Sequence, residues 1–264
     1  MHSACPMTPI SALTCSKYRR CFSFWAVLLG IALLFCSSLA ARERCGVEAK
    51  LLVSSIDLHR SLAVLHAVSE SHGEVYLFDT DGLELLSQGV ILRLRMGADA
   101  DLTVKMRSSE AVELKDFSEA GERFKCEIDL VGNAALTSHF LRAAWKSRQI
   151  PRTGEELRAA LSPGQLKLLT AGRISIDWHR VKRIAQIQAT DWEVRTDGPP
   201  RKVTVELWEW SNGKILELSA KTDPQRGAST MGQLRDRAVA NGLMIEKNQE
   251  PKTSLVLHAL RPAP

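Results

Sequence analysis

Charged and apolar side chains alternate along stretches of this sequence that have the composition of β-strands. In the stretch 92–96, Leu-Arg-Leu-Arg-Met, Arg93 and Arg95 point to one side of a strand and the leucines point to the other. The stretch 102–107 repeats this pattern with Lys105 and Arg107. Arginine and lysine side chains at several heights of one face can bind a chain of phosphates through charge-assisted hydrogen bonds.

Carboxylates lie on the same kind of face in other expected strands. The residues that share a face are Glu48 with Lys50, Glu127 with Asp129, and Glu217 with Ser219 and Lys221. Carboxylate oxygens are the ligands that hard divalent cations prefer. If the sheet closes on itself, one interior would therefore hold both a polyanion site and a metal site. Periodicity alone favours an open antiparallel sheet, with a solvated charged face and an apolar face under helices, because charge alternation usually marks a solvated face.

The remaining sequence predicts strands before and after a helical middle. Strands are expected at 45–53, 74–80, 90–96, 102–107, 122–131, 173–180, 186–195, 202–208 and 215–221. Helices are expected at 56–68, 134–146, 153–161, 163–170 and 230–241. Residues 197–200 and 211–213 carry the turn residues of hairpins.

Residues 1–40 have the pattern of an export segment. Lys17, Arg19 and Arg20 precede an uncharged, largely apolar run that ends at Ala40. Small residues at Ser38 and Ala40 favour cleavage before Ala41, although the run is also long enough to remain as a membrane anchor. Either way, we expect a periplasmic or extracellular domain at 41–260, followed by a loose tail at 261–264.

Composition excludes several classes of protein. The chain has 35 basic and 30 acidic residues, and without the three cations of the export segment it holds 32 and 30, a net charge of +2. A nearly neutral domain argues against specific nucleic-acid binding. With 45% apolar and 25% charged residues, the chain is neither disordered nor a multispan membrane protein. We expect membrane contact only through an uncleaved N-terminal segment, and oligomeric state stays open.

Three consecutive motifs resemble the CYTH superfamily, also called triphosphate tunnel metalloenzymes. They are Tyr-Leu-Phe-Asp-Thr-Asp at 76–81, Leu-Arg-Leu-Arg at 92–95 and Asp-Leu-Thr-Val-Lys at 101–105. The resemblance is strong over 74–107 and thinner over 46–53, 122–130 and 202–257. It implies an α+β fold in which helices surround a closed eight-stranded antiparallel β tunnel. Such tunnels bind triphosphate-containing ligands with Mg²⁺ or Mn²⁺, and the superfamily includes triphosphatases and some adenylate cyclases.

The resemblance also assigns site residues. Its phosphate ligands correspond to Lys50, Arg93, Arg95, Lys105, Arg107 and Lys221, with a further cation from Arg180 or Arg183. Its metal ligands correspond to Glu48, Glu127, Asp129 and Glu217.

Two carboxylates of the family pattern are absent. The opening Glu-x-Glu-x-Lys motif has Gly46 at its first position, and the late Glu-Leu-Glu-Leu-Lys strand has Ser219 at its third. Because metal affinity depends on ligand charge and number, we expect weak binding of a divalent cation and impaired metal-assisted hydrolysis.

Two functions therefore stay open. The first is an exported metal-dependent triphosphatase. The second is a non-catalytic module that binds polyphosphate or another polyanion in the same basic tunnel.

Cys45 and Cys126 are the two cysteines outside the export segment. Each directly precedes a position expected to face the tunnel, so both should point outward and could form a disulfide across the barrel wall. No CxxC motif or HExxH motif indicates a zinc site.

Overall fold

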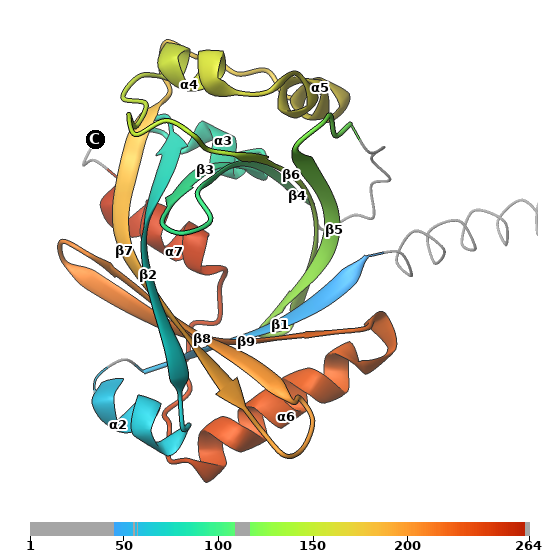
Figure 1. Ribbon diagram of the computed structural model, residues 1–264, viewed down its shortest axis with the longest axis vertical. Coiled ribbons are helices and arrows are strands. Elements are labelled where there is room, and N and C mark those ends of the chain that lie inside the picture. The colour runs from blue at the N-terminus through green and yellow to red at the C-terminus, as the bar shows by residue number, and fades with distance from the viewer. Residues whose placement is uncertain (1–44, 55, 57, 109–116, 262–264) are drawn as a thin grey trace, which may run out of the picture. The chain divides into compact units, whose positions relative to one another are not determined.

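The computed structural model describes residues 45–54, 56, 58–108 and 117–261, which belong to one compact unit, Ala41–Pro264. Within these residues nine strands form a closed barrel in the order β1-β5-β6-β4-β3-β2-β7-β8-β9 (Figure 1). The strands are β1 (Gly46–Val53), β2 (Val68–Asp79), β3 (Val90–Met96), β4 (Asp101–Ser108), β5 (Glu122–Val131), β6 (Ala134–Ala144), β7 (Lys182–Arg195), β8 (Lys202–Trp210) and β9 (Gly213–Thr222).

Closure of the sheet depends on β1. This strand pairs with β9 in antiparallel orientation and with β5 in parallel orientation, whereas the other neighbours in the barrel are antiparallel. The expected closed barrel is thus confirmed, but the expected number of eight strands is wrong. Each of the nine strands has a hydrogen-bonded neighbour on both edges, so none lies outside the ring.

The helix predicted at 134–146 is also wrong, because β6 occupies this stretch. Gly132, with φ of 60°, and Asn133 form a two-residue loop, and Val131 then pairs with Ala134. The alanine and leucine content of this stretch favours a helix locally. Pairing with β5 on one edge and β4 on the other overrides that preference.

The strand predicted at 173–180 is absent from the sheet. Arg173 adopts φ of 57°, and the chain then runs without a strand partner to the turn at Asp177–Arg180. The alternation that predicted a strand is nevertheless real. Ile174, Ile176 and Trp178 pack on the apolar cluster beneath α4 (Gly154–Ala160) and α5 (Pro163–Ala171).

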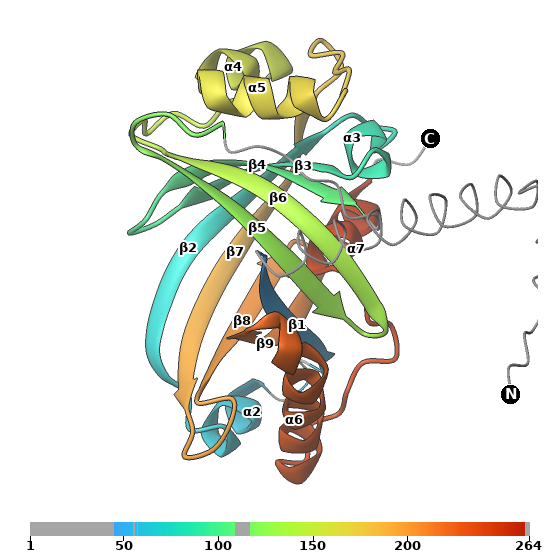
Figure 2. The ribbon, with the colours of Figure 1, turned by 90° about the vertical axis from the view of Figure 1, so that its right-hand side faces the viewer.

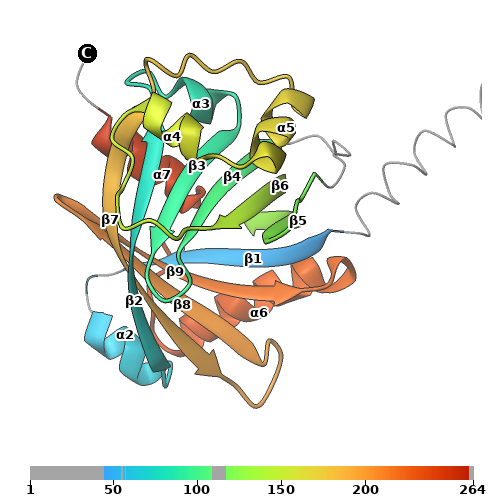
Figure 3. The same cartoon turned by 45° about the horizontal axis from the view of Figure 1, so that its top comes forward.

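Helices cover the outer, apolar face of the barrel on two sides. α4 and α5 lie over β3, β4 and β6, where Leu157 and Leu168 pack against Leu92, Val104 and Leu141 (Figure 2). α6 (Gly227–Ala240) and α2 (Leu58–Val64) cover β1, β8 and β9 on another side (Figure 3). Since the apolar faces point outward under these helices, the charged faces of the strands line the interior.

Three further helices complete the described part of the chain. α3 (Glu84–Ser87) connects β2 to β3, and a short 3-10 helix, η1 (Pro224–Arg226), precedes α6. α7 (Lys252–Leu260) packs Val256 and Leu257 against Leu77 of β2, Ile187 of β7 and Trp208 of β8. This packing brings the first residues of α7 to the cavity.

The expected export segment lies outside the described residues. Among the residues described, no helix has both the length and the apolar character needed to cross a membrane.

Candidate functional site

The barrel interior contains a cavity of about 260 Å³. It gathers ten of the eleven site residues expected from the sequence, namely Glu48, Lys50, Arg93, Arg95, Lys105, Arg107, Glu127, Asp129, Glu217 and Lys221. Eight basic and six acidic side chains line it in total, an excess of two positive charges if all are ionised. A closed wall with both signs of charge can bind a polyanion together with a cation.

Arg180 is the expected site residue that lies elsewhere. It follows α5 and pairs with Glu84 of α3, with 2.6 Å between Nη2 and Oε1 and about half of its side chain exposed. The alternative, Arg183, lies on β7 with its guanidinium 5.6 Å from the centroid of the Tyr76 ring. Neither residue lines the cavity.

Asp129 is the most strongly paired carboxylate of the cavity. Its Oδ1 accepts a hydrogen bond of 2.6 Å from Lys50 Nζ, and its Oδ2 accepts one of 2.7 Å from Lys105 Nζ. Ser138 Oγ donates a third, at 3.0 Å. Burial alone would raise the pKa of Asp129, but the charges of Lys105, Lys50 and Arg107 outweigh it and hold the pKa well below its ordinary value.

Glu48, Glu127 and Asp129 form an acidic cluster whose carboxylate oxygens lie within 4.8 Å of one another. Strand pairing creates it, since Glu48 is opposite Asp129 in the parallel pair β1–β5. Burial and the charge of Glu48 raise the pKa of Glu127. Burial opposes ionisation of Glu48 as well, but Lys50, whose Nζ lies 3.0 Å from Oε2, lowers its pKa. Crowded buried carboxylates of this kind favour a divalent cation among them.

Several arginine nitrogens in the cavity have no partner among the described residues. The Nε atoms of Arg93, Arg107 and Arg142 are buried and make no hydrogen bond there. Burial and the neighbouring charge of Arg95 lower the pKa of Arg93 to about 9, so it keeps its charge at neutral pH. Buried donors without acceptors are costly, and an anionic ligand would satisfy them.

Four charged residues of the cavity were not predicted from the sequence: Arg142, Asp191, Glu206 and Lys252. Glu206 and Asp191 lie on strands that were predicted, so alternation along those strands could have found them. Arg142 was hidden because its stretch was interpreted as a helix. Lys252 belongs to α7, which was not predicted.

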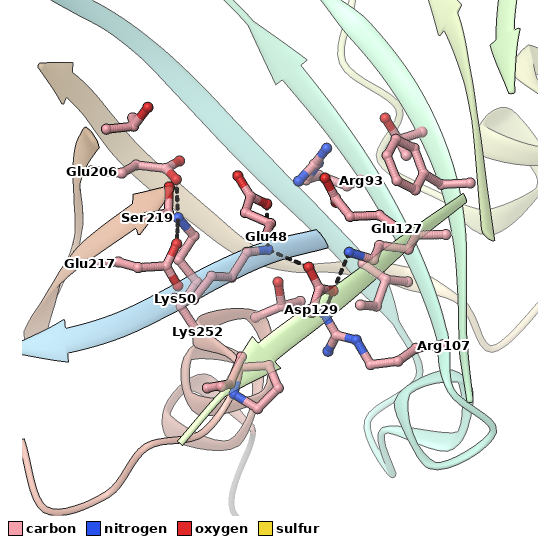
Figure 4. Close-up of a pocket in the computed structure, with 18 of the residues that line it drawn as sticks. Glu48, Lys50, Arg93, Arg107, Glu127, Asp129, Glu206, Glu217, Ser219 and Lys252 are labelled. Carbon is pink, nitrogen blue, oxygen red and sulfur yellow. Dashed lines mark hydrogen bonds and ion pairs between the residues drawn. The ribbon is translucent and has the colours of Figure 1, made fainter. Parts of the chain in front are cut away.

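The missed Lys252 contacts one of the predicted metal ligands. Its Nζ lies 2.9 Å from Glu217 Oε1 and also forms an ion pair with Glu206 Oε2 (Figure 4). Burial would raise the pKa of Glu206, but Lys252 and Arg95 lower it to about 2. Glu217 is thus not a member of the acidic cluster, although its charge acts on Lys50, which binds Asp129.

Cys45 and Cys126 form the disulfide that the sequence suggested, with their Cα atoms 4.7 Å apart. It joins β1 to β5 one residue before Gly46 and Glu127, which face each other in the parallel pair. His139 Nε2 lies 3.4 Å from Cys126 Sγ, and burial lowers the pKa of this histidine.

Comparison with solved structures finds proteins of similar fold. A Hippeastrum protein, described as a candidate adenylyl cyclase with a dominant triphosphatase activity, aligns with a TM-score of 0.53 and 15% identity over 82% of this chain and 97% of its own. A candidate adenylate cyclase from Bacillus halodurans aligns with a TM-score of 0.47 and 16% identity over 79% and 93% of the two chains. No family model and no curated protein matches the sequence. At this level of identity the likeness concerns the fold, and it confirms the CYTH-like fold expected from the sequence.

Proposed function

We propose that this protein is a metal-dependent triphosphatase that binds a triphosphate or a short polyphosphate in its barrel. One observation carries the proposal: a closed barrel encloses eight basic residues and the three-carboxylate acidic cluster in a single cavity. The triphosphatase activity described for the Hippeastrum protein of similar fold supports it.

The acidic cluster fits a hard divalent cation such as Mg²⁺ or Mn²⁺, because three carboxylates there offer oxygen ligands close together. Glu48, Glu127 and Asp129 would hold the ion. A bound cation of this kind supplies charge neutralisation of phosphoryl oxygens and activation of water.

The basic residues of the cavity bind and orient the phosphate chain. Arg93, Arg107 and Arg142 come from β3, β4 and β6, and their buried donors approach the cavity from adjoining strands. Negative charge spreads over the oxygens of the transferred phosphoryl group in the transition state. Guanidinium groups already fixed in the barrel wall stabilise that charge without reorganisation.

We place this activity outside the cytoplasm. The proposal rests on the basic and apolar pattern of residues 1–40. The disulfide between Cys45 and Cys126 supports it, since disulfides persist in oxidising compartments.

A specific observation also favours the second function, a polyanion-binding module without turnover. Gly46 and Ser219 stand where the family pattern has carboxylates, whereas six of the seven expected phosphate ligands line the cavity. A protein of this second kind would bind polyphosphate and release no phosphate.

Phosphate release from inorganic triphosphate, ATP and polyphosphate, measured with Mg²⁺, with Mn²⁺ or with EDTA, separates the two functions. We expect release with a divalent cation and none with EDTA. Glu127→Gln tests the acidic cluster and should abolish release while phosphate binding persists. Tight binding of polyphosphate without release under every metal condition would establish the binding module instead.

A further inference from the structure

The ammonium group of Lys252 occupies a fixed place between two carboxylates on the β8–β9 side of the cavity. Figure 4 shows its nitrogen between Glu206 and Glu217, with both of which it forms ion pairs. The same nitrogen lies 4.7 Å from the centroid of the Trp208 ring, in the range of a cation–π contact. Lys252 therefore has three partners, all on β8 and β9.

This arrangement is buried and anchored by a helix. The side chains of Lys252 and Glu217 are 11% and 3% exposed. Lys252 is the first residue of α7, whose Val256 and Leu257 pack inside the barrel. Removing one partner of a buried ion pair leaves an uncompensated charge, so the lysine cannot leave at little cost.

Few oxygens of Glu206 and Glu217 remain to bind a metal ion. Glu206 Oε1 accepts a hydrogen bond of 2.6 Å from Trp208 Nε1 and lies 3.7 Å from Arg95 Nη2. Glu206 Oε2 and Glu217 Oε1 bind Lys252, which leaves Glu217 Oε2 as the one carboxylate oxygen of the pair without a partner among the described residues.

Ser219 further reduces the number of metal ligands beside Glu217. It follows Glu217 on the same face of β9 and offers a neutral hydroxyl group where the family pattern has a carboxylate. Asp191, which feels the charge of Glu206, does not complete a group of three carboxylates within 4.8 Å there, as Glu48, Glu127 and Asp129 do at the acidic cluster. A divalent cation therefore meets less ligand charge on this side of the cavity, and its affinity falls with ligand charge and number.

Building on the proposed function, we propose that the barrel binds one divalent cation, at the acidic cluster, and that Lys252 takes the place of a second. The acidic cluster lies on β1 and β5, Lys252 lies at the start of α7, and all of them line the same cavity, so a phosphate chain can contact both. Lys252 thereby supplies one positive charge where a second metal ion would supply two. The predicted metal ligand Glu217 then serves to position Lys252.

The number of Mn²⁺ ions bound per chain tests this inference without any phosphate ligand or turnover. We would titrate the metal-free protein with Mn²⁺ and follow free Mn²⁺ by electron paramagnetic resonance. We expect one ion in the wild type and in Lys252→Arg, which keeps the cation. Lys252→Met, which frees Glu206 and Glu217, should gain a second and weaker site, and Ser219→Glu added to Lys252→Met should tighten it.

Lys221→Met is the matched control, because Lys221 also lines the cavity but forms no ion pair with Glu206 or Glu217 and should leave one site. Two Mn²⁺ ions in the wild type, or one in a folded Lys252→Met variant, would overturn the inference. Two Mn²⁺ ions in a wild type that hydrolyses triphosphate would overturn this inference and leave the triphosphatase proposal intact. One ion without hydrolysis would support the inference and overturn the triphosphatase proposal.

Discussion

Cys45 and Cys126 join the two strands that carry the acidic cluster, one residue before the position where Gly46 faces Glu127. The disulfide lies at β1–β5, the only parallel pair among the described strands. Parallel pairing is slightly weaker per residue than antiparallel pairing. The covalent link therefore strengthens the place where the sheet closes and where Glu48 and Asp129 lie opposite each other.

Removing the disulfide should destabilise the fold and loosen the metal site together. The bond closes a loop with a sequence separation of 81 residues. Loops of this size predict a loss of about 2–5 kcal/mol in unfolding free energy for Cys45→Ser with Cys126→Ser. Denaturant unfolding with and without reductant, and Mn²⁺ titration of the same samples, would measure both effects. Unchanged stability after complete reduction would contradict this role.

Arg95→Ala and Arg180→Ala should affect triphosphate binding differently, although both residues were expected to be phosphate ligands. Arg95 lines the cavity, whereas Arg180 pairs with Glu84 on the surface. Loss of a charge-assisted contact costs about 1.5–3 kcal/mol, or about 10- to 150-fold in affinity for triphosphate. Isothermal titration with inorganic triphosphate should show that loss in Arg95→Ala and wild-type affinity in Arg180→Ala. Equal losses in both variants would show that the cavity is not the phosphate site.

The alternation of charged and apolar residues along a strand correctly predicted which side chains line the cavity, because alternation depends only on the local sequence. The expected strand at 90–96 has the bounds observed for β3, and its Arg93 and Arg95 line the cavity. The motif at 76–81 proves to be structural. Buried Asp79 accepts hydrogen bonds from the backbone N–H groups of Thr80, Leu85 and Leu86, which positions α3 between β2 and β3.

The site residues that were not predicted from the sequence depend on contacts between distant parts of the chain. Lys252 and Glu217 are 35 residues apart, and no spacing rule links a lysine at the start of an unpredicted helix to a strand. Arg142 was assigned to a helix because local propensity cannot register that β5 and β4 pair with its stretch on both edges. The resemblance assigned Arg180 to the site, but the strand expected at 173–180, which would have carried it, does not form.

Asp191 should make stability depend on pH. Burial and the charge of Glu206 raise the pKa of Asp191 to about 6 in the folded protein. The folded state then binds this proton more tightly than the unfolded chain does, so the stabilisation is present below the ordinary pKa and is lost as pH rises towards 6.

Asp191→Asn removes this dependence. Its melting temperature should exceed that of the wild type at pH 7, and the difference should shrink as pH falls from 6 to 4. Asp197→Asn, at an exposed position in the β7–β8 turn, is the control and should leave the pH profile unchanged. A melting-temperature difference that is constant between pH 4 and 7 would contradict the assignment.

Gly46→Glu should strengthen the metal site more than Ser219→Glu does, because the two positions have different neighbours. Gly46 faces Glu127, and a Cβ atom added there meets nothing within 4 Å, so a glutamate fits beside the acidic cluster. Another carboxylate adds ligand oxygens and negative charge, which raises affinity for a divalent cation. The variant should bind Mn²⁺ more tightly and hydrolyse triphosphate faster.

Ser219→Glu would instead place its carboxylate beside Glu217, where Lys252 already neutralises the charge. While Lys252 is present, this variant should therefore change Mn²⁺ affinity and turnover little. Titration with Mn²⁺ and phosphate release, measured on the two single variants and on the double variant, compare the positions directly. A larger gain from Ser219→Glu than from Gly46→Glu would mean that the working metal ion binds on the β8–β9 side of the barrel, where Glu206 and Glu217 lie.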